Sequence, residues 1–357
     1  MVPDPNAPLH WDLFCRVIDN HGDLGVCWRL ARALARRGHV VRLWVDDANA
    51  LAWMAPESEP GVVVKAWTDD APDAVGDVVV EAFGCDPPAA MVATMARRQP
   101  APVWINLEYL SAERWVERSH GLPSPTRWGL TKWFFFPGFT AATGGLLRDG
   151  DTQRPPEGPD GRQWLACQGW SAREDERVVS LFCYPNPRLQ AWLQALAVQP
   201  TLLLATPGPA QDGLRALRAP PAVRVLELPW LPQPVYDTLL RSCDLNLVRG
   251  EDSFAQALWA DAPLLWHIYP QHDGVHAGKL HAFLDLYLAS LQPGPAAAVR
   301  QAFLHWNGLA DNLALPDLAS WARAHQAFSR GLLAQDDLAT QLTRFVTAKR
   351  GAVQPAC

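Results

Sequence analysis

The sequence predicts an α/β fold built from two Rossmann-like domains. Short apolar segments typical of buried strands alternate with segments of helical periodicity, and this alternation begins twice along the chain. A polar stretch rich in proline and glycine, residues 148–162, separates the two series. We expect the two domains to face a central cleft, with functional residues in the loops after strands, where open α/β sheets bind ligands.

The first series begins with an expected strand at residues 11–18. A helix follows, in which Val26, Leu30 and Leu34 recur at helical spacing and which Gly38 can end. The other elements expected here are strands at residues 40–45, 62–66, 78–82 and 103–105 and a helix at residues 89–97. Residues 108–147 are less regular, and we expect their aromatic residues 133–136 to pack in the core.

The second series repeats the pattern with expected strands at residues 178–183, 201–205, 222–226, 245–248 and 263–266. Helices fill the gaps, and one begins after Gly250. Residues 316–349 are expected to be helical. The predicted domains are residues 1–150 and 151–335, followed by a C-terminal helix and tail, residues 336–357, that could pack back on the first domain.

Composition excludes several classes of protein. The net charge of −6 argues against nucleic acid or an anionic membrane as partner. There is no run of 18 apolar residues to cross a membrane, and the N-terminus lacks the features of a signal peptide. Seven cysteines without a CxxC pair indicate reduced thiols, so we expect a cytoplasmic protein.

The loop after the first strand carries two acids, Asp19 and Asp23, and the glycines Gly22 and Gly25. It lacks the GxGxxG pattern of dinucleotide enzymes, and Asp23 would repel a pyrophosphate at the helix N-terminus. This favours a cationic or protic acceptor, with one acid as base and the other as its orienting partner. The alternative is that either aspartate is an N-cap and the glycines only form a turn.

A second polar loop follows the strand at residues 245–248. Arg249, Ser253 and the amides of the next helix could hold a diphosphate without metal. Glu251 or Asp252 could accept hydrogen bonds from a ribose or sugar hydroxyl. The alternative is a capping cluster with solvated side chains.

Four histidines lie between residues 267 and 281. His272 and His276 have the i, i+4 spacing of an HExxH zinc motif, but Asp273 replaces the glutamate and Gly274 follows. No other ligand set is evident, so we expect no metal.

Four segments together resemble one family. They are VIDNHGDLGVCWRLAR (17–32), SLFCYPNP (180–187), LPWLPQPVYDTLL (228–240) and DLNLVRGEDSFAQALWADAPLLWHIYPQ (244–271). In order and spacing they resemble the bacterial protein-arginine rhamnosyltransferases that modify elongation factor P. The likeness runs from about residue 11 to residue 281, and more loosely to the end.

The resemblance implies a GT-B fold with the acceptor half first and the donor half second. It implies that L-rhamnose passes from dTDP-β-L-rhamnose to an arginine of elongation factor P with inversion, by single displacement with an aspartate base. It further implies that no metal or other cofactor is needed, and that the modification supports translation of polyproline stretches.

The resemblance also assigns residues to roles. The two loop acids fall on Asp19 and Asp23, and the essential glutamate falls on Glu251. The donor-binding positions fall on Phe182, Tyr184, Gln233, Arg249, Asp252 and Ser253. The acceptor-side loop includes Asn20, Gly22 and Gly25, and His21 stands where an aromatic residue such as phenylalanine is expected.

The chemistry agrees with these residues. A guanidinium has no free lone pair, so a carboxylate must take or polarise an N–H proton as the C–N bond forms. Asp23 is the first candidate, with Asp19 orienting it or the guanidinium. Arg249 would stabilise the leaving diphosphate. Phe182 and Tyr184 could stack on thymine and sugar, or be ordinary core residues.

Three other functions remain open on the residues alone. One is a GT-B enzyme that uses another nucleotide sugar and a small-molecule or lipid acceptor, although no membrane-binding segment is obvious. Another is a dehydrogenase, against which the missing glycine and the loop acid argue. The third is a non-catalytic sugar-nucleotide-binding module, against which the acid pair and Glu251 argue.

Overall fold

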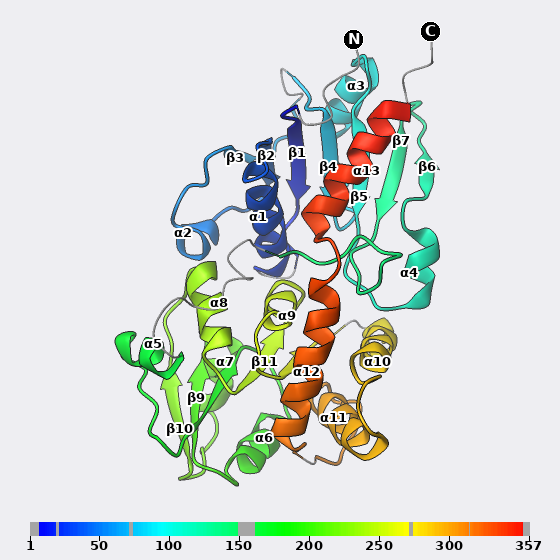
Figure 1. Cartoon of the computed structure of the whole chain (residues 1–357). Coiled ribbons are helices and arrows are strands. Elements are labelled where there is room, and N and C mark those ends of the chain that lie inside the picture. The colour runs from blue at the N-terminus through cyan, green and yellow to red at the C-terminus, as the bar shows by residue number, and fades with distance from the viewer. Residues whose placement is uncertain are drawn as a thin grey trace. The chain divides into compact units, whose positions relative to one another are not determined.

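The computed structural model describes residues 7–352, apart from 19–20, 71–73, 149–160, 271–273 and 314. The chain divides into two compact units. The first unit comprises Met1–Asp149 together with Leu333–Cys357, and the second comprises Gly150–Leu332. Each unit is built on its own sheet, as Figure 1 shows.

The first unit has a seven-stranded sheet in the order β3-β2-β1-β4-β5-β7-β6. All neighbouring strands are parallel except β6 and β7. The strands are β1 (His10–Cys15), β2 (Val40–Val45), β3 (Val62–Ala66), β4 (Val78–Ala82), β5 (Val103–Leu107), β6 (Pro123–Pro125) and β7 (Thr131–Phe135). The helices are α1 (Gly22–Ala35), α2 (Leu51–Met54), α3 (Ala89–Arg97), α4 (Arg114–Ser119) and α13 (Leu338–Ala352).

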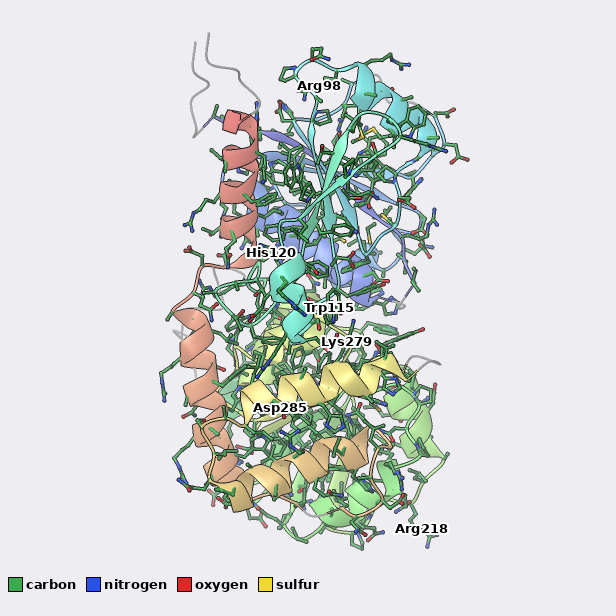
Figure 2. All side chains as sticks on the ribbon, turned by 90° about the vertical axis from the view of Figure 1, so that its right-hand side faces the viewer. Arg98, Trp115, His120, Arg218, Lys279 and Asp285 are labelled. Carbon is green, nitrogen blue, oxygen red and sulfur yellow. The ribbon has the colours of Figure 1, made fainter. Side chains whose placement is uncertain are left out.

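Alternating side chains of these strands build two cores, one on each face of the sheet. On β1, Leu13 and Cys15 pack with α1 and α13, whereas Phe14 packs on the opposite face with α3. The strands are therefore apolar on both faces, as expected for a buried parallel sheet. His120, which is labelled in Figure 2, follows α4. Its ring contacts that of Phe135 on β7, with centroids 4.6 Å apart.

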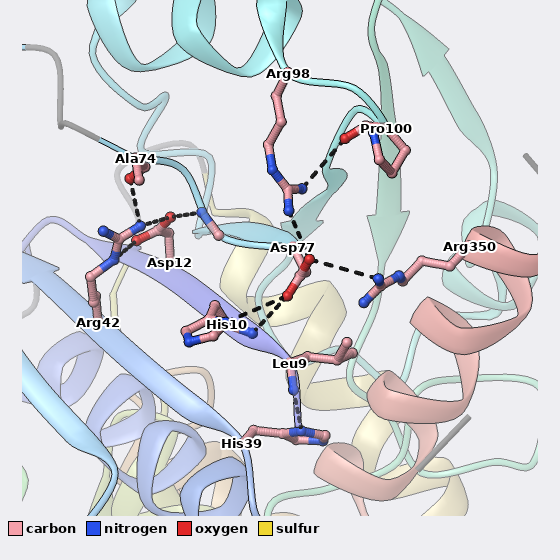
Figure 3. A network of polar contacts seen from close by, with 11 residues as sticks. Leu9, His10, Asp12, His39, Arg42, Ala74, Asp77, Arg98, Pro100 and Arg350 are labelled. Atoms are coloured by element: carbon pink, nitrogen blue, oxygen red, sulfur yellow. Dashed lines mark hydrogen bonds and ion pairs between the residues drawn. The ribbon is translucent and has the colours of Figure 1, made fainter. Parts of the chain in front are cut away.

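Helix α13 belongs to the first unit although the whole second unit separates it from β7 in the sequence. Leu338, Leu342 and Val346 are fully buried in the core that α1 covers. Arg350 lies 3.7 Å from Asp77, which also accepts hydrogen bonds from Arg98 and from the His10 amide (Figure 3).

The second unit has a five-stranded, fully parallel sheet in the order β10-β9-β8-β11-β12. The strands are β8 (Arg177–Leu181), β9 (Thr201–Ala205), β10 (Val223–Glu227), β11 (Leu245–Arg249) and β12 (Leu264–His267). The helices are α5 (Gly161–Cys167), α6 (Leu189–Leu196), α7 (Pro209–Arg215), α8 (Gln233–Arg241), α9 (Asp252–Ala257), α10 (Val275–Tyr287), α11 (Pro293–Trp306) and α12 (Leu318–Leu333).

The predicted alternation of strands and helices is confirmed, and several elements differ from the prediction in their bounds; the strand expected at residues 178–183, for example, ends at Leu181. The first strand ends at Cys15 rather than at residue 18. The region at residues 108–147 contains α4 and the strands β6 and β7, so the aromatic run belongs largely to a strand. The helical tail is two helices, and Asp337 starts the second by accepting a hydrogen bond from the Thr340 amide at 2.7 Å.

Candidate active site

The acidic loop of the first unit lies at the carboxyl end of β1, where Gly22, Asp23 and Gly25 form the first turn of α1. Asp23 is only 4% exposed, and its Oδ2 accepts a hydrogen bond from the Ile18 amide at 2.9 Å. The start of a helix stabilises a carboxylate there. Asp23 is therefore an anchored acid at the edge of the sheet where ligands of such folds bind. Asp19 and Asn20 lie outside the described residues.

The buried thiol of Cys27 lies on α1, four residues after Asp23, and its pKa is affected by the Asp23 carboxylate. Burial raises the pKa of Cys27 well above its ordinary value, with smaller contributions from Cys15, from the Asp23 carboxylate and from Cys85. The Cys27 thiol lies in the core and keeps its proton at neutral pH, so it is not an active nucleophile.

The loop after β8 places two aromatic rings beneath a cation. Phe182 directly follows the strand and Tyr184 is 5% exposed. The guanidinium carbon of Arg249, the last residue of β11, lies 4.3 Å from the Phe182 ring centroid and 4.8 Å from that of Tyr184. Arg249 Nη1 also lies 3.4 Å from the Cys183 carbonyl oxygen. The rings hold the guanidinium by cation–π contact.

Arg249 is 7% exposed, and within the described residues no carboxylate lies within 4.0 Å of it. A buried cation without a counter-charge is costly, so the geometry favours an anionic ligand at this position.

The remaining residues of the second loop sit around the start of α9. Glu251 immediately precedes the helix, and Gln233 donates through Nε2 to Asp252 Oδ2 at 3.1 Å. The Ser253 hydroxyl donates to the Arg249 carbonyl and accepts from the Arg249 amide at 3.2 Å. Ser253 thus fixes the backbone that carries the cation, and the six predicted donor-binding residues lie in one unit on neighbouring elements.

His267 is a neighbour of this cluster that sequence reasoning did not place in it. It ends β12 directly opposite Arg249 in the strand register, and its ring contacts Tyr184 edge-on at 5.3 Å. Burial, with help from the Arg249 charge, lowers the pKa of His267 to about 4. The imidazole is therefore neutral at pH 7 and adds no second positive charge.

The histidines considered as metal ligands are separated among elements. His267 ends β12, His276 and His281 lie on α10, and His272 lies outside the described residues. Among the described residues, no group of three histidine, cysteine, aspartate or glutamate side chains is placed to hold a metal ion.

Comparison with known proteins identifies the family. The family model described as Elongation-Factor P (EF-P) rhamnosyltransferase EarP matches residues 11–347. This chain belongs to that family. The protein-arginine rhamnosyltransferase of Pseudomonas aeruginosa is 44% identical over 94% of this chain and 98% of its own length. That of Neisseria meningitidis serogroup B is 35% identical over 94% and 96%.

Solved structures agree with the family and the fold. One, described as the structural basis for EarP-mediated arginine glycosylation of translation elongation factor EF-P, is 31% identical with a TM-score of 0.65, covering 97% of this chain and 100% of its own. The calicheamicin glycosyltransferase, 17% identical with a TM-score of 0.56 over 98% and 100%, shares the fold alone. The chain is thus a protein-arginine rhamnosyltransferase of GT-B fold, and the predicted family, enzyme class and fold class are confirmed. No helix among the described residues is long and apolar enough to cross a membrane.

Proposed function

We propose that this enzyme transfers L-rhamnose from dTDP-β-L-rhamnose to an arginine side chain of elongation factor P, with inversion. The observation that carries the proposal is Arg249, a buried guanidinium held on two aromatic rings without a carboxylate partner among the described residues. Such a group suits the diphosphate of a nucleotide sugar.

The second unit is the donor unit in this proposal. Arg249 binds the diphosphate, and Phe182 and Tyr184 flank the thymine and the sugar. Glu251 and Asp252 follow Arg249 by two and three residues in the chain, and Gln233 is bonded to Asp252, so we assign these three residues to hydrogen bonds with the sugar hydroxyls. As the bond from the anomeric carbon to the diphosphate breaks, charge grows on the leaving group, and Arg249 stabilises it.

The first unit supplies the base. An acceptor nitrogen attacks the anomeric carbon from the face opposite the leaving group, which converts the β-linked donor into an α-linked product. Asp23 accepts the proton that this nitrogen loses, and dTDP departs with the electron pair of the broken bond. Asp19 orients the guanidinium or Asp23. Arg249 supplies the positive charge that a divalent metal would otherwise bring, so we propose that no metal is required.

Elongation factor P is proposed as a folded acceptor. A flexible guanidinium must be aligned with the anomeric carbon, and such positioning is worth roughly 7–11 kcal/mol in the best intramolecular cases. A folded domain docked on the first unit can supply this orientation, whereas free arginine or a linear peptide cannot. We therefore expect much slower transfer to denatured acceptor or to a peptide of its loop.

The deciding experiment is intact-mass analysis of elongation factor P incubated with this enzyme and dTDP-β-L-rhamnose, with excess EDTA in a parallel reaction. A gain of one deoxyhexose on one arginine, unchanged by EDTA, supports the proposal. No mass gain would refute the donor–acceptor pair, and a loss of transfer that only a divalent cation restores would refute the metal-free mechanism.

A further inference from the structure

A cavity in the first unit opens at the carboxyl ends of β1 and β2, beside the acidic loop. It has a volume of about 550 Å³, within the ~300–1,000 Å³ range of small-ligand sites. It is lined by Val17, Ile18, His21, Leu24, Asp47, Asn49, Ala50 and Trp53. None of these residues has a part in the reaction as proposed above.

The walls combine one carboxylate with aromatic and aliphatic surface. Asp47 is exposed, and its Oδ1 is fixed by the Asn49 amide at 2.9 Å. Among the described residues, no cationic side chain lies within 4.0 Å of Asp47. The rings of Trp53 and His21 meet edge-on with centroids 5.1 Å apart. A carboxylate beside an indole and apolar side chains suits a cation on an aliphatic stem, as in lysine or arginine.

The same composition disfavours a phosphate-bearing ligand. Asp46 stands next to Asp47, and its Oδ1 accepts hydrogen bonds from the amides of Val17 and Asp47. A diphosphate in this cavity would meet the Asp47 carboxylate, and the residues that line the cavity include no lysine or arginine.

Two residues that line the cavity are neighbours of the proposed base, Asp23. Ile18 lines the cavity and donates its amide to the Asp23 carboxylate at 2.9 Å. Leu24, the residue after Asp23, also lines it. Because an extended chain advances about 3.5 Å per residue, a segment that presents its arginine to Asp23 carries neighbouring side chains within reach of Asp47 and Trp53.

We propose that this cavity is an acceptor subsite that binds a second cationic side chain, lysine or arginine, close to the target arginine of the protein acceptor. The inference rests on the proposed function, because it requires that a protein arginine be presented to Asp23. Asp47 pairs with the cation, and Trp53 covers the aliphatic stem. The subsite makes the enzyme select its target arginine by the charge of the neighbouring residues.

The test compares steady-state rates of Asp47→Asn with those of the wild type and of Glu57→Gln, which removes the same charge from an exposed position outside the cavity. We expect Asp47→Asn to raise the KM for folded acceptor about five- to tenfold, with kcat and the donor KM unchanged. Trp53→Ala should raise the acceptor KM and Trp53→Phe should largely restore it. Equal thermal unfolding midpoints establish that the variants remain folded.

The decisive experiment reverses the charge on both sides of the proposed contact, at Asp47 and on the acceptor. Basic residues flanking the target arginine are replaced one at a time by glutamate, and each acceptor is assayed with wild-type enzyme and with Asp47→Lys. One acceptor variant should be poor with the wild type and regain at least about fivefold with Asp47→Lys. If Asp47→Asn behaves like Glu57→Gln, or raises the donor KM instead, the subsite is refuted while the proposed function stands. If the wild type transfers no deoxyhexose, the proposed function fails and the subsite fails with it.

Discussion

The two units arrange their parallel strands in the same order, β3-β2-β1-β4-β5 in one and β10-β9-β8-β11-β12 in the other. In both, the residue directly after the corresponding strand β4 or β11 adopts a left-handed conformation, Phe83 with φ 59° and Gly250 with φ 62°. The charges at this edge are opposite, with Asp23 anchored in the first unit and Arg249 in the second. In the proposed function, the shared strand order sets where each ligand binds, and the loop side chains set the sign of the charge it carries.

The largest effect is expected from removing the acid of the first unit. Asp23→Ala and Asp23→Asn should each lower kcat by about 10²–10⁴-fold, because neither replacement side chain can take the acceptor proton. The Asp23→Asn variant would keep a side-chain oxygen for the Ile18 amide, so the loop should be preserved. Donor titration by calorimetry should give wild-type affinity. Near-normal turnover in either variant would remove Asp23 from the role of base.

Removing the Arg249 guanidinium of the second unit should weaken binding of the nucleotide-sugar donor. Arg249→Gln should weaken dTDP binding by about 10–100-fold, as expected for charge-assisted hydrogen bonds to a diphosphate. Arg249→Lys keeps the charge but loses the planar fork, so an intermediate affinity is expected. Calorimetry with dTDP alone measures this. Unchanged affinity in Arg249→Gln would break the comparison between the two units, since the second unit would then not select its ligand by charge.

Glu251, two residues after Arg249 in the chain, tests whether a carboxylate of this loop takes part in donor binding. Glu251→Ala should weaken donor binding or lower kcat about tenfold, because a hydrogen bond to a charged group contributes about 1.5–3 kcal/mol. Glu251→Gln, which keeps the acceptor oxygen, is the matched control. The donor KM and kcat of both variants, measured at saturating acceptor, give the outcome. Wild-type values for both constants in Glu251→Ala would place this residue outside the site.

The smallest effect concerns the neutral His267 beside Arg249. Its folded-state pKa of about 4 lies below the ordinary value of 6.5, so the unfolded chain binds the proton more readily. The stability that depends on the neutral ring is present above pH 6.5 and is lost as the pH falls toward 4. At pH 5 this group should lower the free energy of unfolding of the wild type by at most about 2 kcal/mol, and the His267→Gln variant should not show this decrease. Thermal unfolding at pH 7 and pH 5 measures it, and equal acid sensitivity of variant and wild type would contradict the expectation.

Much of the fold could be predicted because buried parallel strands are apolar on both faces and stand out from the polar loops between them. The end of β1 could not be predicted. Val17 and Ile18 are as apolar as a strand, yet their amides are bonded to the carboxylates of Asp46 and Asp23 instead of to a neighbouring strand. Ile18 is consequently 61% exposed.

Part of the candidate site could also be predicted, because several of its residues are close together in the sequence. Residues 244–254 are contiguous, so the sequence alone brings Arg249, Glu251 and Ser253 together. His267 faces Arg249 only because β12 pairs with β11 in one particular register, which no local pattern specifies. The cavity beside Asp23 likewise depends on how α2 packs against the loop after β1. Its residues Trp53 and Asp47 belong to no recognisable sequence motif.

The position of α13 has a consequence for how this protein is made. Its residues Leu338, Leu342 and Val346 complete the apolar face of a sheet whose strands are all made before it. At about 5–20 residues per second, the roughly 200 residues between β7 and α13 take about 10–40 s to be synthesised. The second unit, which is continuous in sequence, has emerged before the first can close. The nascent chain therefore carries an uncovered hydrophobic surface until α13 has been made, and termination before α13 would leave the second unit whole and the first unfinished.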